Sequence, residues 1–136
     1  APVSRDNSHR DRREVIIMRT AGILGFLGVA LGALGAHGVK SWLGDAPDAA
    51  QRLDWWHTAV LYHLVHALFV LGCSSLGASP WATRLAVGGV VLFSGSLYLM
   101  TLSGMAMPFA MITPFGGLLF LAAWAVVIVA KVQPKS

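Results

Sequence analysis

The feature that most constrains the fold is the recurrence of long apolar segments. Four of them are long enough, or nearly so, to cross about 30 Å of hydrocarbon at about 1.5 Å per residue of helix. These segments are residues 20–37, 56–78, 85–103 and 109–130. Ser79-Pro80 separates the second from the third, and residues 105–108 separate the third from the fourth. The sequence therefore predicts an all-α protein, a bundle of four transmembrane helices.

The composition favours a membrane protein over a soluble one. Hydrophobic residues make up 56% of the 136 residues and charged residues only 12%, whereas soluble domains carry about 25% charged residues. The net charge of +4 does not indicate nucleic-acid binding, because the cations lie in the first nineteen residues or just outside the apolar segments. The single Cys73 excludes an internal disulfide and a cysteine-based zinc site.

The positions of lysine and arginine predict the orientation. With four crossings, both tails and the turn around Arg84 lie on one side and carry eight of the ten Lys and Arg residues. The other side holds only Lys40 and Arg52. The positive-inside rule therefore predicts that both termini are cytoplasmic, or face the matrix in a mitochondrion. Three tryptophans are then expected at the outer interface: Trp42, Trp55 and Trp56.

We divide the chain into a polar basic tail at 1–18, a four-helix membrane domain at 19–131 and a C-terminal tail at 132–136. Apolar residues within the loop at 38–55 predict a short interfacial helix between the first two spans; they are Val39, Trp42, Leu43 and Leu53. The charged start and the first apolar segment also resemble a cleavable signal peptide. We favour a retained span, because a secretory signal has no need of regularly spaced glycines.

Those glycines lie in residues 22–38, which read GILGFLGVALGALGAHG. Each glycine weakens a helix in water by about 0.5–1 kcal/mol relative to alanine. In a membrane, by contrast, small residues let neighbouring helices approach closely. The glycines that occupy heptad a and d positions are Gly25, Gly28, Gly32 and Gly35. We expect them to form a packing surface against another helix rather than a ligand cleft or a nucleotide-binding loop.

The second span carries two histidines that would lie inside the bilayer. His63 and His66 are three residues apart, about 60° around the helix, and ionisable residues within a membrane normally face the bundle interior. Hydroxyl groups on the third and fourth spans fall at similar depths. The predicted intramembrane polar layer comprises His63, His66, Tyr98, Ser94, Ser96 and Thr113. We expect both histidines to point inward, and at least one to contact a polar group of the third or fourth span.

This layer has three interpretations. The first, which we favour, is a hydrogen-bonded network that joins the helices. The second is a site for protons or a small solute, and the third is a binding site for metal, haem or quinone. A metal would have only His63, His66 and His37 as candidate ligands, because no Asp or Glu lies in a predicted span. The same lack of carboxylates leaves no group to orient a histidine for hydrolysis. We therefore expect no cofactor, no bound metal and no enzymatic activity.

Four motifs carry a resemblance to a known family. In chain order they are GALGAHGVK, TAVLYHLVHAL, LFSGSLYLM and ITPFGGLLFLAAW. Over about residues 19–130 the chain resembles the domain-of-unknown-function family 423, small four-helix membrane proteins of bacteria with eukaryotic relatives. Because members often begin near the equivalent of Met18, the resemblance implies that residues 1–17 are an added tail or an upstream start. It implies a topology but no biochemical activity.

The function expected from these features is structural or accessory, as a subunit or stabiliser of a membrane complex. The alternatives are a minimal proton or small-solute transporter or channel that uses the histidines, and a haem-, quinone- or metal-binding membrane protein. The expected partners are the lipid bilayer and a larger complex or a homo-oligomer, with no nucleic acid. The expected location is the bacterial inner (plasma) membrane, or the mitochondrial inner membrane in a eukaryote.

Overall fold

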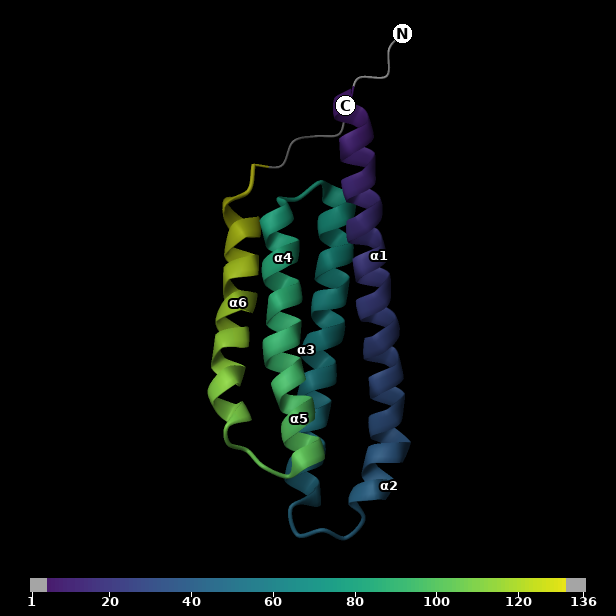
Figure 1. Ribbon diagram of the computed structural model, residues 1–136, viewed down its shortest axis with the longest axis vertical. Coiled ribbons are helices and arrows are strands. Elements are labelled where there is room, and N and C mark those ends of the chain that lie inside the picture. The colour runs from purple at the N-terminus through teal and green to yellow at the C-terminus, as the bar shows by residue number, and fades with distance from the viewer. Residues whose placement is uncertain (1–4, 132–136) are drawn as a thin grey trace.

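The computed structural model describes residues 5–131 and forms four long helices that run side by side (Figure 1). Short π-helical turns, η1 and η2, interrupt the first and third of these helices without breaking them. The elements in chain order are α1 (Arg5–Leu34), η1 (Gly35–Val39), α2 (Lys40–Leu43), α3 (Ala49–Leu76), α4 (Pro80–Gly89), η2 (Val90–Ser94), α5 (Gly95–Ser103) and α6 (Phe109–Val129). All four long helices are long and apolar enough to cross a bilayer, as the sequence predicted.

The first two helices extend beyond their predicted spans. The first is helical from Arg5 to Leu43, and α3 begins at Ala49, so only residues 44–48 connect them. Within the loop expected at 38–55, α2 (Lys40–Leu43) continues the first helix and residues 49–55 belong to α3, and an interfacial position for this segment stays a prediction. Hydropathy detects only the apolar part of a helix, whereas polar helix formers continue it beyond the membrane. Residues 1–4 and 132–136 of the predicted tails lie outside the described part of the chain.

Glycine and serine define the sharp connection between α3 and α4. Gly77 ends α3 in the left-handed conformation, with φ of 63°, a conformation that other residues adopt at a cost. Ser79 caps α4, because its side chain accepts a hydrogen bond from the backbone N–H of Trp81 at 3.3 Å, and Pro80 occupies the first helical position. The third and fourth helices end at Ser103 and Val129, close to the predicted ends at 103 and 130.

Helix α3 is the centre of the arrangement. It packs against α1 on one side and against α4, η2 and α5 on the other, and α6 packs against α4, η2 and α5. In Figure 1 the helices accordingly follow the order α6, α4–α5, α3, α1 across the view. Small side chains fill the closest contacts, since Ala59, Ala82, Ala86 and Ala123 have no exposed surface. The fold is thus a three-helix group of α3 to α6 with α1 attached along α3.

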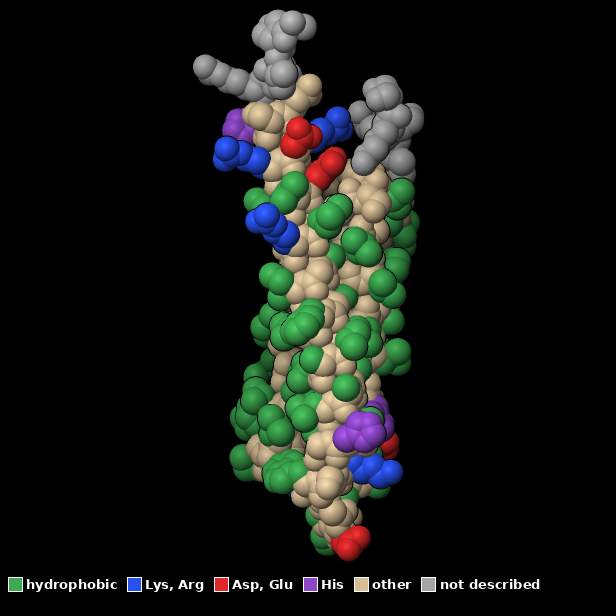
Figure 2. All heavy atoms as spheres, turned by 90° about the vertical axis from the view of Figure 1, so that its right-hand side faces the viewer, with side chains coloured by type: hydrophobic (Ala, Val, Ile, Leu, Met, Phe, Trp, Pro, Cys, Tyr) green, Lys and Arg blue, Asp and Glu red, His purple; other side chains and the backbone are tan. Residues whose placement is uncertain are grey.

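The outer faces of α1 and α6 are almost entirely uncovered by protein. Only 11% of the apolar stretch of α1 and 17% of that of α6 are buried, against 44% for each of the other two helices. Figure 2 shows hydrophobic side chains along the length of the visible face, with charged side chains gathered near its two ends. Contiguous apolar surface of this extent is unfavourable in water but suits a hydrocarbon environment.

The predicted glycine surface faces α3, with one exception. A Cβ atom added at Gly28 would lie 2.6 Å from Leu64 Cδ2, one at Gly32 would lie 3.3 Å from Val60 Cγ1, and one at Gly35 would collide with the indole of Trp56. These three glycines therefore set the distance between α1 and α3.

Gly25 does not belong to this contact, which corrects the prediction of a four-glycine surface. A Cβ atom added at Gly25 would have no neighbour within 4 Å. At about 100° per residue, Gly25 lies about 60° around the helix from Gly28, and that rotation takes it away from α3. Heptad spacing alone did not reveal this difference.

The difference between Gly25 and Gly28 gives a matched test of the packing. We expect Gly28→Leu to lower the stability of the protein in detergent by about 1–3 kcal/mol, because the new side chain must displace Leu64 and push α1 away from α3. Gly25→Leu adds the same side chain to the same helix without a clash, so it should leave the stability nearly unchanged. Thermal unfolding followed by circular dichroism measures both. Equal melting temperatures for the two variants would contradict the packing assignment.

Candidate functional site

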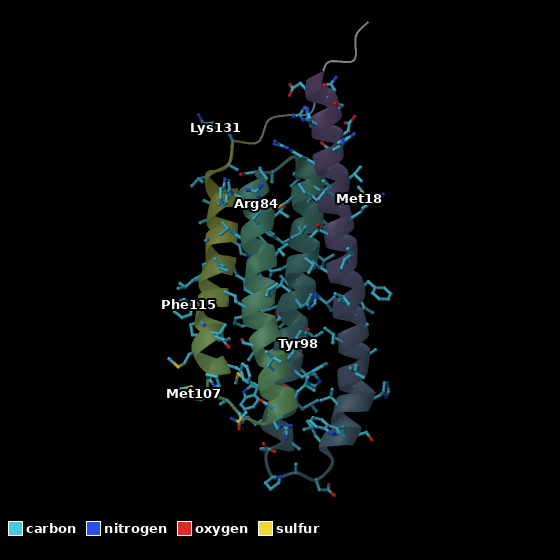
Figure 3. The ribbon with its side chains drawn as sticks, in the orientation of Figure 1. Met18, Arg84, Tyr98, Met107, Phe115 and Lys131 are labelled. Carbon is cyan, nitrogen blue, oxygen red and sulfur yellow. The ribbon has the colours of Figure 1, made fainter. Side chains whose placement is uncertain are left out.

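The side chains of the predicted polar layer lie in the interior, as expected. His63 and His66 are 4% and 3% exposed, Ser94 and Ser96 are buried, and Tyr98 and Thr113 are half-buried. Figure 3 places Tyr98 among the helices, far from the end that bears Arg84 and Lys131. The structure therefore brings all six side chains to the contacts of α3, η2, α5 and α6.

His66 has both ring nitrogens hydrogen-bonded within the protein. Its Nδ1 lies 2.8 Å from the carbonyl oxygen of Tyr62, one turn earlier in α3, and the indole Nε1 of Trp124 in α6 donates to its Nε2 at 3.3 Å. A carbonyl oxygen only accepts and an indole N–H only donates, so these partners define a neutral ring with its proton on Nδ1. The ring also stacks on Phe120, with centroids 3.6 Å apart.

His63 is bonded on one side only. Its Nδ1 lies 3.2 Å from the hydroxyl oxygen of Tyr98 in α5, which confirms the expected contact with the third span. Its Nε2 is buried without a hydrogen-bond partner, although the backbone of Leu24 in α1 lies beside the ring. At this level α1 presents Gly28, where an added Cβ atom would lie 3.4 Å from His63 Cδ2.

The serine and threonine hydroxyls form separate pairs rather than joining the histidines. Ser94 Oγ donates to the carbonyl oxygen of Ala59 in α3 at 2.8 Å, and Ser96 Oγ lies 2.6 Å from Thr113 Oγ1 in α6. Ser94 and Ser96 thus face different helices. The predicted single layer is therefore a set of pairwise bonds, each of which connects two helices or, for Tyr62 and His66, two turns of one helix.

The candidate metal ligands do not come together. Within residues 5–131, no group of three or more His, Cys, Asp or Glu side chains could hold a metal ion. His37 is exposed on η1, whereas His63 and His66 are buried in α3. The geometry therefore offers no third nitrogen ligand to the two histidines.

Trp56 is a structural residue whose position the sequence did not predict. The sequence predicted only its level, at the outer interface; the structure shows that it is 2% exposed and lies between α1 and α3. Its Nε1 donates to the carbonyl oxygen of Leu31 at 2.8 Å. In a regular α-helix that oxygen would accept the N–H of Gly35, where the π-helical turn η1 begins. Gly35 leaves the space that the indole of Trp56 occupies. This glycine was the only feature of the sequence that pointed to a large side chain packed there.

Arg52 is a second residue whose role the sequence did not predict. From the first turn of α3, its Nε donates to the carbonyl oxygen of Thr101 at 2.8 Å and its Nη2 to that of Leu102 at 3.3 Å. Thr101 Oγ1 donates in return to the carbonyl oxygen of Arg52 at 2.9 Å. A cation at the C-terminal end of α5 also interacts favourably with the helix dipole. Arg52 therefore fastens α3 to α5 at the end opposite the termini.

A groove of about 560 Å³ lies on one side of His66, between α3, η2 and α6. Its lining is mostly aromatic and includes Tyr62, Phe93, Phe120 and Trp124. The groove offers apolar contact surface, and the two nitrogens of His66 are already bonded to other groups. It is therefore suited to a lipid chain or a flat apolar ligand rather than to a charged solute.

Comparison with known proteins gives consistent matches. The sequence matches the family described as "Protein of unknown function (DUF423)" over residues 31–117. The chain is 42% identical over 114 residues to UPF0382 membrane protein YwdK of Bacillus subtilis (79% of this chain, 88% of that protein). It is 37% identical over 121 residues to UPF0382 inner membrane protein YgdD of Escherichia coli (85% and 88%). A staphylococcal relative, UPF0382 membrane protein SH2409, is 38% identical over 110 residues (76% and 84%). No solved structure gives a significant match.

Proposed function

Since the chain belongs to the DUF423 family, whose matched relatives are named as membrane proteins, we propose that it is a structural or accessory protein of the membrane. In this role it is a small subunit or a stabiliser of a larger membrane assembly and has no catalytic activity of its own. The lipid bilayer and that assembly are its partners.

The observation that carries this proposal is the pairing of the buried polar groups. His66 is bonded to Tyr62 and Trp124, Ser94 to Ala59, and Ser96 to Thr113. Each of these bonds stabilises a helix or a contact between helices, worth about 0.6 kcal/mol on average in a membrane protein. A catalytic or transport site needs polar groups that remain free for substrate, and the described side chains offer few.

The exposed faces of α1 and α6 support an accessory role. They carry large side chains that are mostly uncovered by the rest of the protein, including Phe26 at 75%, Phe115 at 63% and Ile128 at 81% exposed. In a membrane these side chains contact lipid or other transmembrane helices. Between residues 5 and 131 little structure lies outside the four helices, so we expect a partner to bind within the membrane.

We propose a bacterial inner-membrane location with both ends of the chain in the cytoplasm. The match to a protein named as an inner membrane protein supports the location. The charge distribution supports the orientation, because the end that bears the termini carries most of the described cations, whereas Lys40 and Arg52 lie on α2 and at the start of α3, at the opposite end. Those at the terminal end are Arg10, Arg12, Arg13 and Arg19 on α1, with Arg84 and Lys131 (Figure 3).

Cysteine labelling in intact cells tests this orientation. In a Cys73→Ala background, single cysteines would replace Arg10, Asp45 or Lys131. A membrane-impermeant maleimide added outside the inner membrane should label only Asp45→Cys, since that loop is expected to face outward. Permeabilised cells provide the control, in which all three cysteines should react. Labelling of the two terminal positions from outside would contradict the proposed orientation.

The groove beside His66 favours one second candidate, a binding protein for a flat apolar ligand such as a quinone. Its aromatic lining and volume fit such a ligand. In this case the protein purified in mild detergent would carry the ligand, detectable by absorbance and by mass spectrometry of an organic extract. This candidate concerns binding and adds no chemical step.

Purification from native membranes and reconstitution together test the accessory role. We expect a mild-detergent pull-down to recover a membrane protein partner at fixed stoichiometry, because α1 and α6 leave apolar faces available. Liposomes that contain the purified protein should be no more permeable to protons than empty liposomes. A proton flux that His63→Gln abolishes and His57→Gln, an exposed histidine of the same helix, leaves intact would overturn the accessory role in favour of transport.

A further inference from the structure

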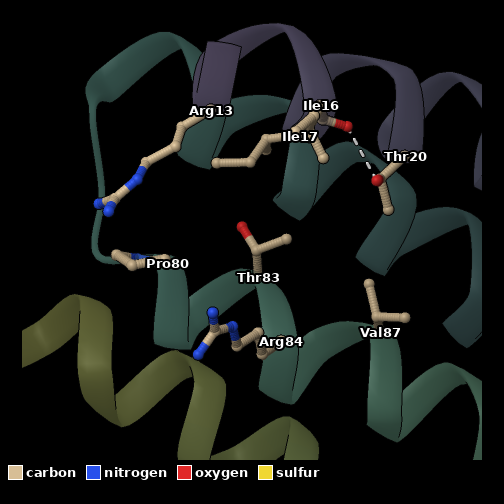
Figure 4. Close-up of a pocket in the computed structure, with 8 residues that line it drawn as sticks. All are labelled: Arg13, Ile16, Ile17, Thr20, Pro80, Thr83, Arg84 and Val87. Atoms are coloured by element: carbon tan, nitrogen blue, oxygen red, sulfur yellow. Dashed lines mark hydrogen bonds between the residues drawn. The ribbon is translucent and has the colours of Figure 1, made fainter. Parts of the chain in front are cut away.

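A second cavity, of about 560 Å³, lies between α1 and α4 at the end that bears the termini (Figure 4). It is separate from the groove beside His66 and shares none of its lining residues. Its lining combines two arginines with apolar and hydroxyl side chains, among them Arg13, Ile17, Thr20, Thr83, Arg84 and Val87.

The two arginines flank this cavity from opposite sides. Arg13 extends from α1 and Arg84 from α4, and both guanidinium groups point toward the same end of the helices (Figure 4). Between residues 5 and 131, the ion pair found is that of Arg52 with Asp48, so neither Arg13 nor Arg84 is held in a direct ion pair there, and no carboxylate lines the cavity. The guanidinium of Arg84 lies 5.2 Å from the centre of the Trp81 ring. The mouth of the cavity is therefore positively charged.

A buried hydroxyl group lies between the arginines without a hydrogen-bond partner. Thr83 is 8% exposed, and its Oγ1 is buried and unpartnered. Figure 4 shows this oxygen directed into the space between α1 and α4. The thiol of Cys73 in α3 lies next to this oxygen, and a thiol is only a weak hydrogen-bonding partner. An unsatisfied hydroxyl is unfavourable inside a protein, and a small shift of the side chains that cover Oγ1 would let an acceptor oxygen from a ligand bond to it.

Deeper in, the cavity is apolar. Ile17 lies opposite Thr83, and farther along the helices Val87 lies opposite Thr20, whose hydroxyl donates to the carbonyl oxygen of Ile16 at 2.9 Å (Figure 4). Thr20 therefore has no need of a polar ligand. A charged mouth above an apolar interior matches a molecule with an anionic head and a hydrocarbon chain.

The position of the cavity indicates where such a molecule comes from. Trp81, 59% exposed beside Arg84, is of the residue type that sits at the membrane–water interface. From that level the cavity follows the apolar parts of α1 and α4 toward the middle of the bilayer. A lipid of the surrounding leaflet can therefore reach it without leaving the membrane.

We propose that this cavity binds one anionic phospholipid of the surrounding bilayer. The phosphate lies between Arg13 and Arg84, a head-group or ester oxygen accepts a hydrogen bond from Thr83, and one acyl chain lies along Ile17 and Val87. Arginine suits this role because its planar guanidinium binds phosphate oxygens in pairs. The lipid would fill the space between α1 and α4, two helices that make little direct contact with each other.

A lipid titration of the purified full-length protein in a neutral detergent tests this proposal. Palmitoyl-oleoyl phosphatidylglycerol should raise the melting temperature of the wild-type protein in a saturable manner and remain bound in native mass spectra. Arg13→Gln combined with Arg84→Gln should weaken this binding roughly tenfold or more. Arg12→Gln combined with Arg19→Gln is the matched control, because it removes the same charge from the same end outside the cavity and should have a much smaller effect.

Further variants and ligands show which chemical groups are responsible for the binding. Thr83→Val, which keeps the shape of the side chain, should weaken binding by roughly threefold through loss of the hydroxyl. Phosphatidylcholine that stabilises as well as phosphatidylglycerol, or inorganic phosphate that does so alone, would overturn the assignment to an anionic lipid. The assignment also fails if the Arg13/Arg84 variant elutes as folded protein and binds phosphatidylglycerol as tightly as the Arg12/Arg19 control.

Discussion

The whole structure depends on one constraint: a polar group inside hydrocarbon must find its partner within the protein. In a helix the backbone N–H and C=O groups bond to one another, and most of the buried polar side chains follow the same rule. Most side chains that carry a hydrogen-bonding group into the bundle bond to a carbonyl or another side chain, as for Trp56 with Leu31 and Ser94 with Ala59. Among the described residues, His63 Nε2 and Thr83 Oγ1 are the exceptions. The bonds that are made fix which helices are neighbours, and so they account for the central place of α3.

Close packing follows from the same constraint, because helices in a membrane gain little from hydrophobicity toward one another. Gly28, Gly32 and Gly35 let α3 approach α1, and Gly116 lets the backbone of Phe93 approach α6 so closely that a Cβ atom there would clash. Both contacts lie next to polar ones: Gly28 is beside His63, and Phe93 is adjacent to Ser94. Glycine thus allows the approach, and the short polar side chains make it specific.

The sequence predicted the parts of the structure that depend on composition along a helix. The four spans and the inward direction of His63 and His66 follow from hydropathy and from the cost of an imidazole in lipid. The partners could not be predicted in the same way, because they depend on helix rotation and on relative height. A rotation of about 60° removes Gly25 from the contact, and the relative heights of α3 and α6 place His66 against Trp124 rather than a hydroxyl. Arg52 was counted only as a charge, since nothing in the sequence shows that the end of α5 lies beside it.

The central claim is that most of the buried polar groups are committed to bonds within the protein, and His66, with both ring nitrogens bonded, is the most direct place to test it. Nitrogen-15 NMR of protein labelled at histidine, reconstituted in lipid, distinguishes the two neutral tautomers and the charged ring. We expect His66 to be neutral near pH 7 with its proton on Nδ1, because Tyr62 accepts at that atom and Trp124 donates to Nε2. Trp124→Phe should change the Nε2 resonance, whereas Trp81→Phe should not. A ring protonated on Nε2, or one that exchanges its proton with water, would contradict the account.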